Sequence, residues 1–229
     1  MKKLMLGLMM AFAVTAEAEW IYGGTGTETN PWNIGFPEAT DVQAWTNGTG
    51  RLTITGKNEM MSFNLIDIST PWPKTIKEVV VDGEVTCIGD KAFVDCGSLT
   101  TVEMPSVITI GTSAFKSCDS LTFIRMPLVS TVCDNAFDGC DSLTSVSMPS
   151  VGNIGDDVFN SCDSLKSVEI PSLFKIGAGA FGGCMNLTSI TILEENPPWC
   201  KSTSFSSIPA SCTMFISPAA DEDEWETTL

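Results

Sequence analysis

The chain has 229 residues, a formal net charge of −16 and no histidine. The lack of histidine excludes Ser-His-Asp and Cys-His nucleophilic pairs and the usual histidine-containing zinc sites. The acidic balance argues against nucleic acid and anionic membrane surfaces as partners, because both are bound through basic patches.

Residues 1–18 have the pattern of an export signal. A positively charged start is followed by an apolar run over residues 4–14 and then by the small residues Ala16 and Ala18. This order predicts cleavage before Glu19, and the run is too short to span a bilayer as a mature helix. The alternative is a buried N-terminal helix. We therefore expect a secreted or cell-surface protein with no membrane insertion after cleavage.

Residues 19–81 are expected to form a β-rich N-terminal region and cap. Glycine, threonine and asparagine are frequent up to residue 50, which is typical of turns and short strands, and residues 76–81 alternate as a strand does. Trp20, Trp32 and Trp45 have two interpretations. We favour packing in the cap, because aromatic side chains mostly supply buried area, over a carbohydrate-stacking platform.

A 22-residue unit occurs five times between residues 82 and 192. Several apolar columns keep this spacing without an insertion. The columns are Phe93, Phe115, Phe137, Phe159 and Phe181; Cys96, Cys118, Cys140, Cys162 and Cys184; Leu99, Leu121, Leu143, Leu165 and Leu187; and Ile88, Ile110, Val132, Ile154 and Ile176. A glycine follows each member of the last column, except that Cys133 stands in its place once.

Each unit predicts one short strand, L-x-x-V-x-M/I, which proline ends because it has no N–H to continue a ladder. One unit cannot bury its own apolar face, so the units must stack. We expect a leucine-rich-repeat solenoid, a β-rich fold with a parallel sheet and short helical or irregular turns on the convex side. Residues 193–229 are expected to be a C-terminal cap and an acidic tail.

The unit I-G-x-x-A-F-x-x-C-x-S-L-T-x-V-x-M-P resembles the BspA-like type of leucine-rich repeat, which is common in surface and secreted proteins of bacteria. The flanking residues 45–56 and 197–218 are similar to the β-rich segment and the terminal unit that often border such repeats. The resemblance covers about residues 43–225. It implies a solenoid and an association with adhesion to host proteins and cells, but the fold itself does not supply a function.

The nine cysteines invite a disulfide interpretation in an exported chain. The repeating column faces the core with near-parallel Cβ directions, which suits small buried hydrophobic residues better than disulfides. Cys87 and Cys133 belong to different columns and are not expected to pair. Cys200 and Cys212 lie in the expected final cap and could form a disulfide.

Asp119, Asp141 and Asp163 form a further column just before the Ser-Leu of three successive units. One hypothesis is a ladder of calcium sites. The other is turn chemistry, in which aspartate and serine satisfy local backbone N–H groups. We favour the second, because the glycine-rich spacing of calcium-binding rolls is missing, and we predict neither a metal nor a cofactor.

The residues that alternate with the buried positions of the main strands are the candidate partner-binding set. Most are serine or threonine, and Phe123 with Arg125 has the composition of an interface anchor. The alternative is a solvated Phe123 within a cross-strand arrangement of Glu103, Arg125 and Glu169. The full set is Thr101, Glu103, Phe123, Arg125, Ser145, Ser147, Ser167, Glu169, Ser189 and Thr191.

These observations favour an exported, non-enzymatic binding module that holds a protein or glycan, host-derived ligands included, through the sheet face. The first alternative is a structural unit that self-assembles at a cell surface. A carbohydrate-active enzyme that uses paired carboxylates is the weaker alternative, because functional pockets are normally concave and a short stack offers a shallow surface. The sequence names neither the ligand nor the oligomeric state.

Overall fold

The computed structural model describes residues 24–36, 41–63, 70–194, 198–200 and 203–216. The expected export signal at residues 1–18 and Trp20 lie outside these residues. No helix in the described ranges is long and apolar enough to cross a membrane.

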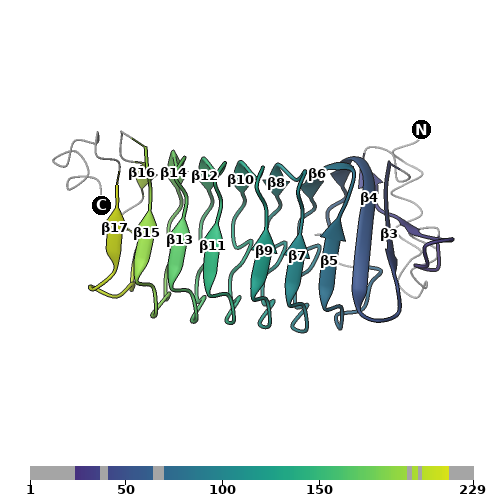
Figure 1. The fold of residues 1–229 in the computed structure, drawn as a ribbon, viewed down its shortest axis with the longest axis horizontal. Coiled ribbons are helices and arrows are strands. Elements are labelled where there is room, and N and C mark those ends of the chain that lie inside the picture. Colours follow the sequence, from purple (N-terminus) through teal and green to yellow (C-terminus); the bar gives the residue numbers. More distant parts are fainter. Residues whose placement is uncertain (1–23, 37–40, 64–69, 195–197, 201–202, 217–229) are drawn as a thin grey trace.

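The chain winds into a β-solenoid in which each turn adds one strand to each of two parallel layers (Figure 1). We call them the front strands and the back strands. The front strands are β5 (Glu78–Val81), β7 (Thr101–Glu103), β9 (Phe123–Arg125), β11 (Ser145–Ser147), β13 (Ser167–Glu169), β15 (Ser189–Thr191) and β17 (Thr213–Phe215). The back strands are β6 (Glu84–Ile88), β8 (Thr109–Ile110), β10 (Thr131–Val132), β12 (Asn153–Ile154), β14 (Lys175–Ile176) and β16 (Trp199–Cys200).

Four strands close the N-terminal end: β1 (Trp32–Asn33), β2 (Gly35–Phe36), β3 (Val42–Thr46) and β4 (Arg51–Met60). Strand β4 pairs with β5 along its first half and with β6 along its second half, so it joins the two layers. Strand β3 pairs antiparallel with β4. The apolar end of the stack is thereby covered by β-structure, as the β-rich composition predicted.

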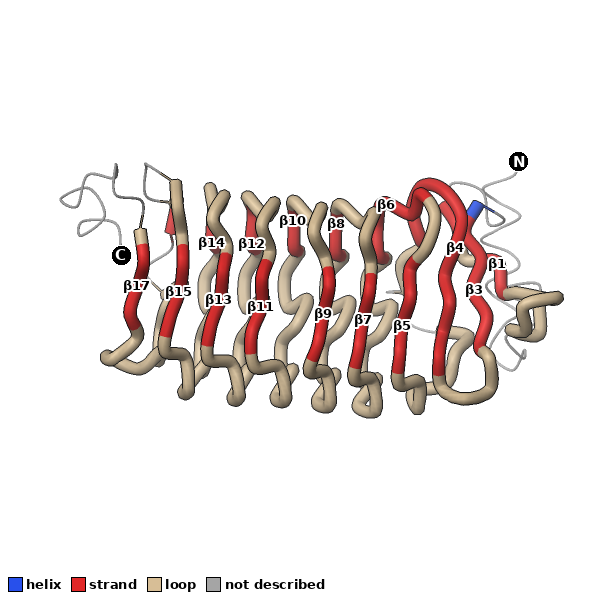
Figure 2. Tube along the Cα trace, in the orientation of Figure 1, coloured by secondary structure: helices blue, strands red, loops and turns tan. Residues whose placement is uncertain are grey.

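The parallel layers follow directly from the repeat. Front strands pair in register at the repeat spacing, as Val146 does with Val168, and back strands do the same, as Val132 does with Ile154. The V-x-x-I-G stretch therefore forms a second sheet of two-residue strands, where the sequence predicted only convex turns. The A-F-x-x-C segment makes tight turns, shown as loop in Figure 2; the Cys96 N–H donates to the Phe93 carbonyl at 3.2 Å.

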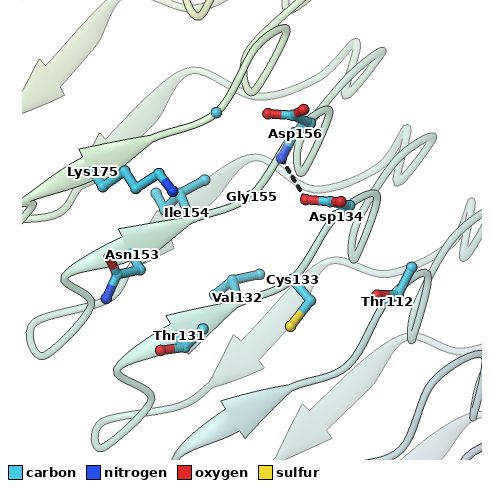
Figure 3. Close-up of a pocket in the computed structure, with 11 residues that line it drawn as sticks. Thr112, Thr131, Val132, Cys133, Asp134, Asn153, Ile154, Gly155, Asp156 and Lys175 are labelled. Atoms are coloured by element: carbon cyan, nitrogen blue, oxygen red, sulfur yellow. Dashed lines mark hydrogen bonds between the residues drawn. The ribbon is translucent and has the colours of Figure 1, made fainter. Parts of the chain in front are cut away.

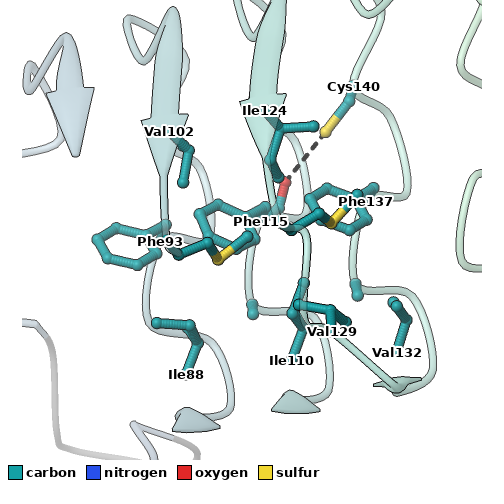
Figure 4. Close-up of a cluster of buried hydrophobic side chains, with 14 of the residues drawn as sticks. Ile88, Phe93, Val102, Ile110, Phe115, Ile124, Val129, Val132, Phe137 and Cys140 are labelled. Atoms are coloured by element: carbon teal, nitrogen blue, oxygen red, sulfur yellow. Dashed lines mark hydrogen bonds between the residues drawn. The ribbon is translucent and has the colours of Figure 1, made fainter. Parts of the chain in front are cut away.

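Phenylalanine rings fill the space between the layers in one continuous stack (Figure 4). Adjacent rings from Phe93 to Phe181 have centroids 4.9–5.5 Å apart and are nearly parallel. The stack begins with Trp72, whose indole N–H donates to the Ala92 carbonyl at 3.1 Å, and ends with Phe205. Phe205, β16 and β17 continue the solenoid by another turn within the segment expected to be the C-terminal cap.

The cysteine column lies beside these rings and is fully buried, as the sequence predicted. The structure adds a polar role. The four thiols from Cys118 to Cys184 each donate to the carbonyl oxygen of a phenylalanine in the preceding turn, for example from Cys140 to Phe115 at 3.3 Å and from Cys184 to Phe159 at 3.1 Å. A cysteine fits here because it is both small and a weak hydrogen-bond donor.

Candidate functional site

The predicted partner-binding residues lie in two rows on the outer face of the front strands. The pairing register aligns Thr101 with Phe123, and Glu103 with Arg125. It likewise aligns the outward residues of β11, β13 and β15, while Val102, Ile124, Val146, Val168 and Ile190 point inward and are buried. The first row is Thr101, Phe123, Ser145, Ser167 and Ser189, and the second is Glu103, Arg125, Ser147, Glu169 and Thr191.

The cross-strand charge arrangement considered for Phe123 and Arg125 does not form in the described part of the chain. Neither Glu103 nor Glu169 makes an ion pair with Arg125. Glu169 lies two strands from β9 and accepts a hydrogen bond from the Ser147 hydroxyl at 2.9 Å. Phe123 keeps 49% of its surface exposed, and the Arg125 guanidinium faces solvent without a carboxylate partner.

A regular ladder of backbone hydrogen bonds joins most neighbouring front strands. The Thr122 and Phe123 N–H groups donate to the Thr100 carbonyl at 3.0 and 3.2 Å. Further along, the Thr188 and Ser189 N–H groups donate to the Lys166 carbonyl at 2.8 and 3.1 Å. The threonine hydroxyls reinforce the pattern, as from Thr122 to the Thr100 carbonyl at 3.1 Å.

This ladder is interrupted between β9 and β11, where the front layer divides into two sheets (Figure 1). Among the described residues, neither Thr144 nor Ser145 donates to the Thr122 carbonyl, and Met126 does not donate to Ser147. The back strands continue without a break from β8 through β10 to β12. We call the gap, with Phe123, Arg125 and Thr144 on its two sides, the front break.

The front break places polar backbone groups beside an aromatic and a cationic side chain. The Thr122 carbonyl and the N–H groups of Thr144 and Ser145, which lack a ladder partner among the described residues, all belong to exposed residues. Ile124 is 9% exposed, whereas the equivalent Val102 is fully buried. An extended segment of a partner can bind such groups through main-chain hydrogen bonds while side chains supply specificity.

The aspartate column at the edge of the front strands carries backbone hydrogen bonds. The Asp119 and Asp141 carbonyls accept from the N–H groups of Ser142 and Ser164, both at 3.1 Å. Burial, followed by the neighbouring Asp119 and Asp163 carboxylates, raises the pKa of Asp141 above its ordinary value. No group of three or more histidine, cysteine, aspartate or glutamate residues that could hold a metal ion occurs among the described residues.

All nine cysteines are free thiols in the structure, Cys200 and Cys212 included, and the proposed disulfide between these two stays a prediction. Burial raises the pKa of the Cys87 thiol to about 11, with Glu59 contributing further, so Cys87 is a poor nucleophile at neutral pH. Of the tryptophans considered for carbohydrate stacking, Trp32 is buried with its ring centroid 6.5 Å from Trp72, and Trp45 is half-buried.

Two surface features were missed by the sequence. The front break lies between repeats with equivalent residues, so no pattern marks it. A polar groove also crosses the back strands, close to the exposed Trp199. The glycine that follows the buried back-strand residue in four of the five repeats was its one available signal, because missing side chains leave a depression.

A family model described as the BspA type leucine-rich repeat region matches residues 86–208, with six copies. No curated protein matches the sequence. Among solved structures, the chain is similar to the leucine-rich repeat protein TpLRR of T. pallidum, with 26% identity and a TM-score of 0.53; the match covers 83% of this chain and 92% of that one.

Two other solved structures are similar in fold at lower identity. A leucine-rich repeat protein of Eubacterium ventriosum has 21% identity and a TM-score of 0.63, over 82% of this chain and 62% of that one. The pneumococcal vaccine antigen PcpA has 17% identity and a TM-score of 0.61, over 84% of this chain and 46% of that one. Bacterial repeat proteins thus share the solenoid described above.

Proposed function

Because the chain belongs to the BspA-type leucine-rich repeat family, we propose that it is an exported, non-enzymatic binding module that adheres to a protein partner through the front break. The members of this family are typically non-enzymatic, and a similar solved structure is a vaccine antigen. The positively charged start of the sequence and the apolar run that follows it support export. Recognition of a partner requires no catalytic step.

The exposed backbone at the front break carries this proposal. Most neighbouring front strands use these N–H and carbonyl groups to bond each other, but at the front break the Thr122 carbonyl and the Thr144 N–H have no such partner among the described residues. A partner segment that satisfies these groups also contacts Phe123 and Arg125. Exposed aromatic and arginine side chains are enriched among the residues that dominate binding energy at interfaces.

The test is binding of the chain lacking residues 1–18 to a panel of purified extracellular matrix proteins, measured by biolayer interferometry. Phe123→Ala and Arg125→Ala should each raise the Kd by about tenfold, the loss expected for a residue that anchors an interface. Phe174→Ala is the matched control, since Phe174 is an exposed phenylalanine immediately before the back strand β14. Unchanged binding in both front variants, or no binding by the parent chain, overturns the proposal.

A further inference from the structure

A polar groove with a volume of about 470 Å³ crosses the back strands β10, β12 and β14 (Figure 3). One bank is a row of side chains from three successive strands, Thr131, Asn153 and Lys175, which the pairing register aligns. The other bank consists of the carboxylates of Asp134 and Asp156. The floor between the banks includes Gly155 and Gly177, which bring no side chain.

Cys133 occupies the equivalent floor position after β10, but the floor carries no side chain at Gly155 and Gly177, and this has a physical reason. The Asp134 carboxylate accepts a hydrogen bond from the Asp156 N–H at 2.8 Å, and the Asp156 carboxylate accepts from the Ala178 N–H at 2.8 Å. Each carboxylate thus reaches one turn along the stack and crosses the glycine that precedes its donor. A Cβ at Gly155 or Gly177 would collide with the carboxylate oxygen. The groove is therefore part of the repeat architecture.

Two exposed aromatic rings stand at the C-terminal end of this groove. Trp199 pairs in register with Lys175, which lines the groove, and the Trp199 N–H donates to the Phe174 carbonyl at 2.9 Å. Trp199 is 76% exposed and Phe174 is 64% exposed, the largest exposures among the hydrophobic side chains of the described residues. An indole held this far into solvent gives up the burial that normally stabilises an aromatic residue.

We propose that the groove and Trp199 together bind a neutral oligosaccharide. Sugar hydroxyls both donate and accept hydrogen bonds, and the groove offers the Lys175 ammonium and the Asn153 amide as donors and the Asp134 carboxylate as an acceptor. The apolar face of a pyranose ring packs on the exposed indole of Trp199. Three strands span about 10 Å at the usual strand spacing, which suits a short chain of sugars running along the solenoid.

Other ligand classes fit this lining less well. The two aspartates repel an anion, and the polar banks leave a purely apolar ligand with unsatisfied groups. The described residues hold no cluster suited to a metal ion. This site is also separate from the front break, because it lies on the other set of strands, so either site can be absent without affecting the other.

The experiment uses the chain lacking residues 1–18 on an array of neutral bacterial, fungal, plant and mammalian oligosaccharides, followed by calorimetric titration of the strongest ligand. Trp199→Ala and Asn153→Ala should each weaken the binding by about tenfold or more, and both side chains are exposed, so the fold should be retained. Phe36→Ala, an exposed phenylalanine on β2 that belongs to neither proposed site, should leave the Kd unchanged.

Three results would overturn the proposal. The first is an array without any bound glycan. The second is glycan binding that survives both Trp199→Ala and Asn153→Ala with an unchanged Kd. The third is calorimetric binding of a peptide that is lost in Trp199→Ala and Asn153→Ala, while no oligosaccharide binds. Failure of the front-break variants in the matrix-protein assay would leave this inference intact, because the readouts use different ligands and different residues.

Discussion

The glycine that follows the back-strand isoleucine is tied to an aspartate one turn earlier. Asp90, Asp134 and Asp156 are each followed, one turn on, by a glycine: Gly111, Gly155 and Gly177. In each case the carboxylate accepts the hydrogen bond of the N–H just beyond that glycine. The exception to the glycine column, Cys133, follows the turn in which Thr112 stands in place of the aspartate. The two departures from the repeat therefore compensate each other.

This coupling predicts how substitutions at Gly155 behave. Gly155→Ala should lower the free energy of unfolding by about 1–3 kcal/mol, the usual cost of overpacking, because the added Cβ meets the Asp134 carboxylate and backbone. The double variant Asp134→Thr with Gly155→Ala should lose less than the sum of the two single losses. Urea unfolding of the four proteins measures this, and simple additivity would contradict the coupling.

The buried thiols predict a loss of stability in alkaline solution. Burial raises the pKa of Cys184 to about 12, from 9.0 in the unfolded chain. A raised pKa in the folded state means that the unfolded chain loses its proton first, so the stabilisation is complete below pH 9 and disappears between pH 9 and 12. The difference in unfolding free energy between the parent chain and Cys184→Ala should therefore narrow from pH 8 to pH 10.5. If the difference in unfolding free energy between the two proteins stays constant with pH in reducing buffer, the pKa of Cys184 is not raised by folding.

At the scale of elements, the repeat spacing was enough to predict the front strands, the phenylalanine and cysteine columns and the direction of stacking. It did not predict a second sheet, because two-residue strands such as β10 and β12 are too short to show an alternating pattern. It also missed Trp72 as the start of the ring stack. In that turn a tryptophan stands in place of the phenylalanine, and the flanking residues do not follow the repeat motif. A repeat pattern predicts only the elements that recur in every unit, and the terminal turns of the solenoid have sequences of their own.

The front break makes its own prediction for hydrogen exchange. The Thr188 N–H donates to the Lys166 carbonyl at 2.8 Å, whereas the equivalent Thr144 N–H makes no such bond to Thr122 among the described residues. The Thr144 amide should therefore exchange much faster than those of Thr122 and Thr188, because a hydrogen-bonded amide exchanges only after its hydrogen bond opens. Site-resolved exchange by NMR tests this, and equal protection at the three threonines would show a continuous ladder.

At the scale of the whole molecule, stacking creates two long faces from one repeated unit, and the residues that vary between turns distinguish them. The front face carries mostly small hydroxyl side chains, with the larger Glu103, Phe123, Arg125, Glu169 and Phe215 as exceptions. The back face is largely polar until it reaches Phe174 and Trp199. The sequence identified the outward rows of the front strands. It could not place Trp199 beside Lys175, because the last turn is longer than the repeat and its register is set by packing.

The most direct test of the proposed binding face is the footprint of a bound partner. With a matrix protein from the panel in saturating amounts, hydrogen–deuterium exchange should slow in residues 122–126 and 144–147 on both sides of the front break. Exchange in the back strands β10 and β12 should stay as it is in the free chain. Protection confined to the back strands, or to either end of the solenoid, would contradict the assignment of the front break as the binding surface.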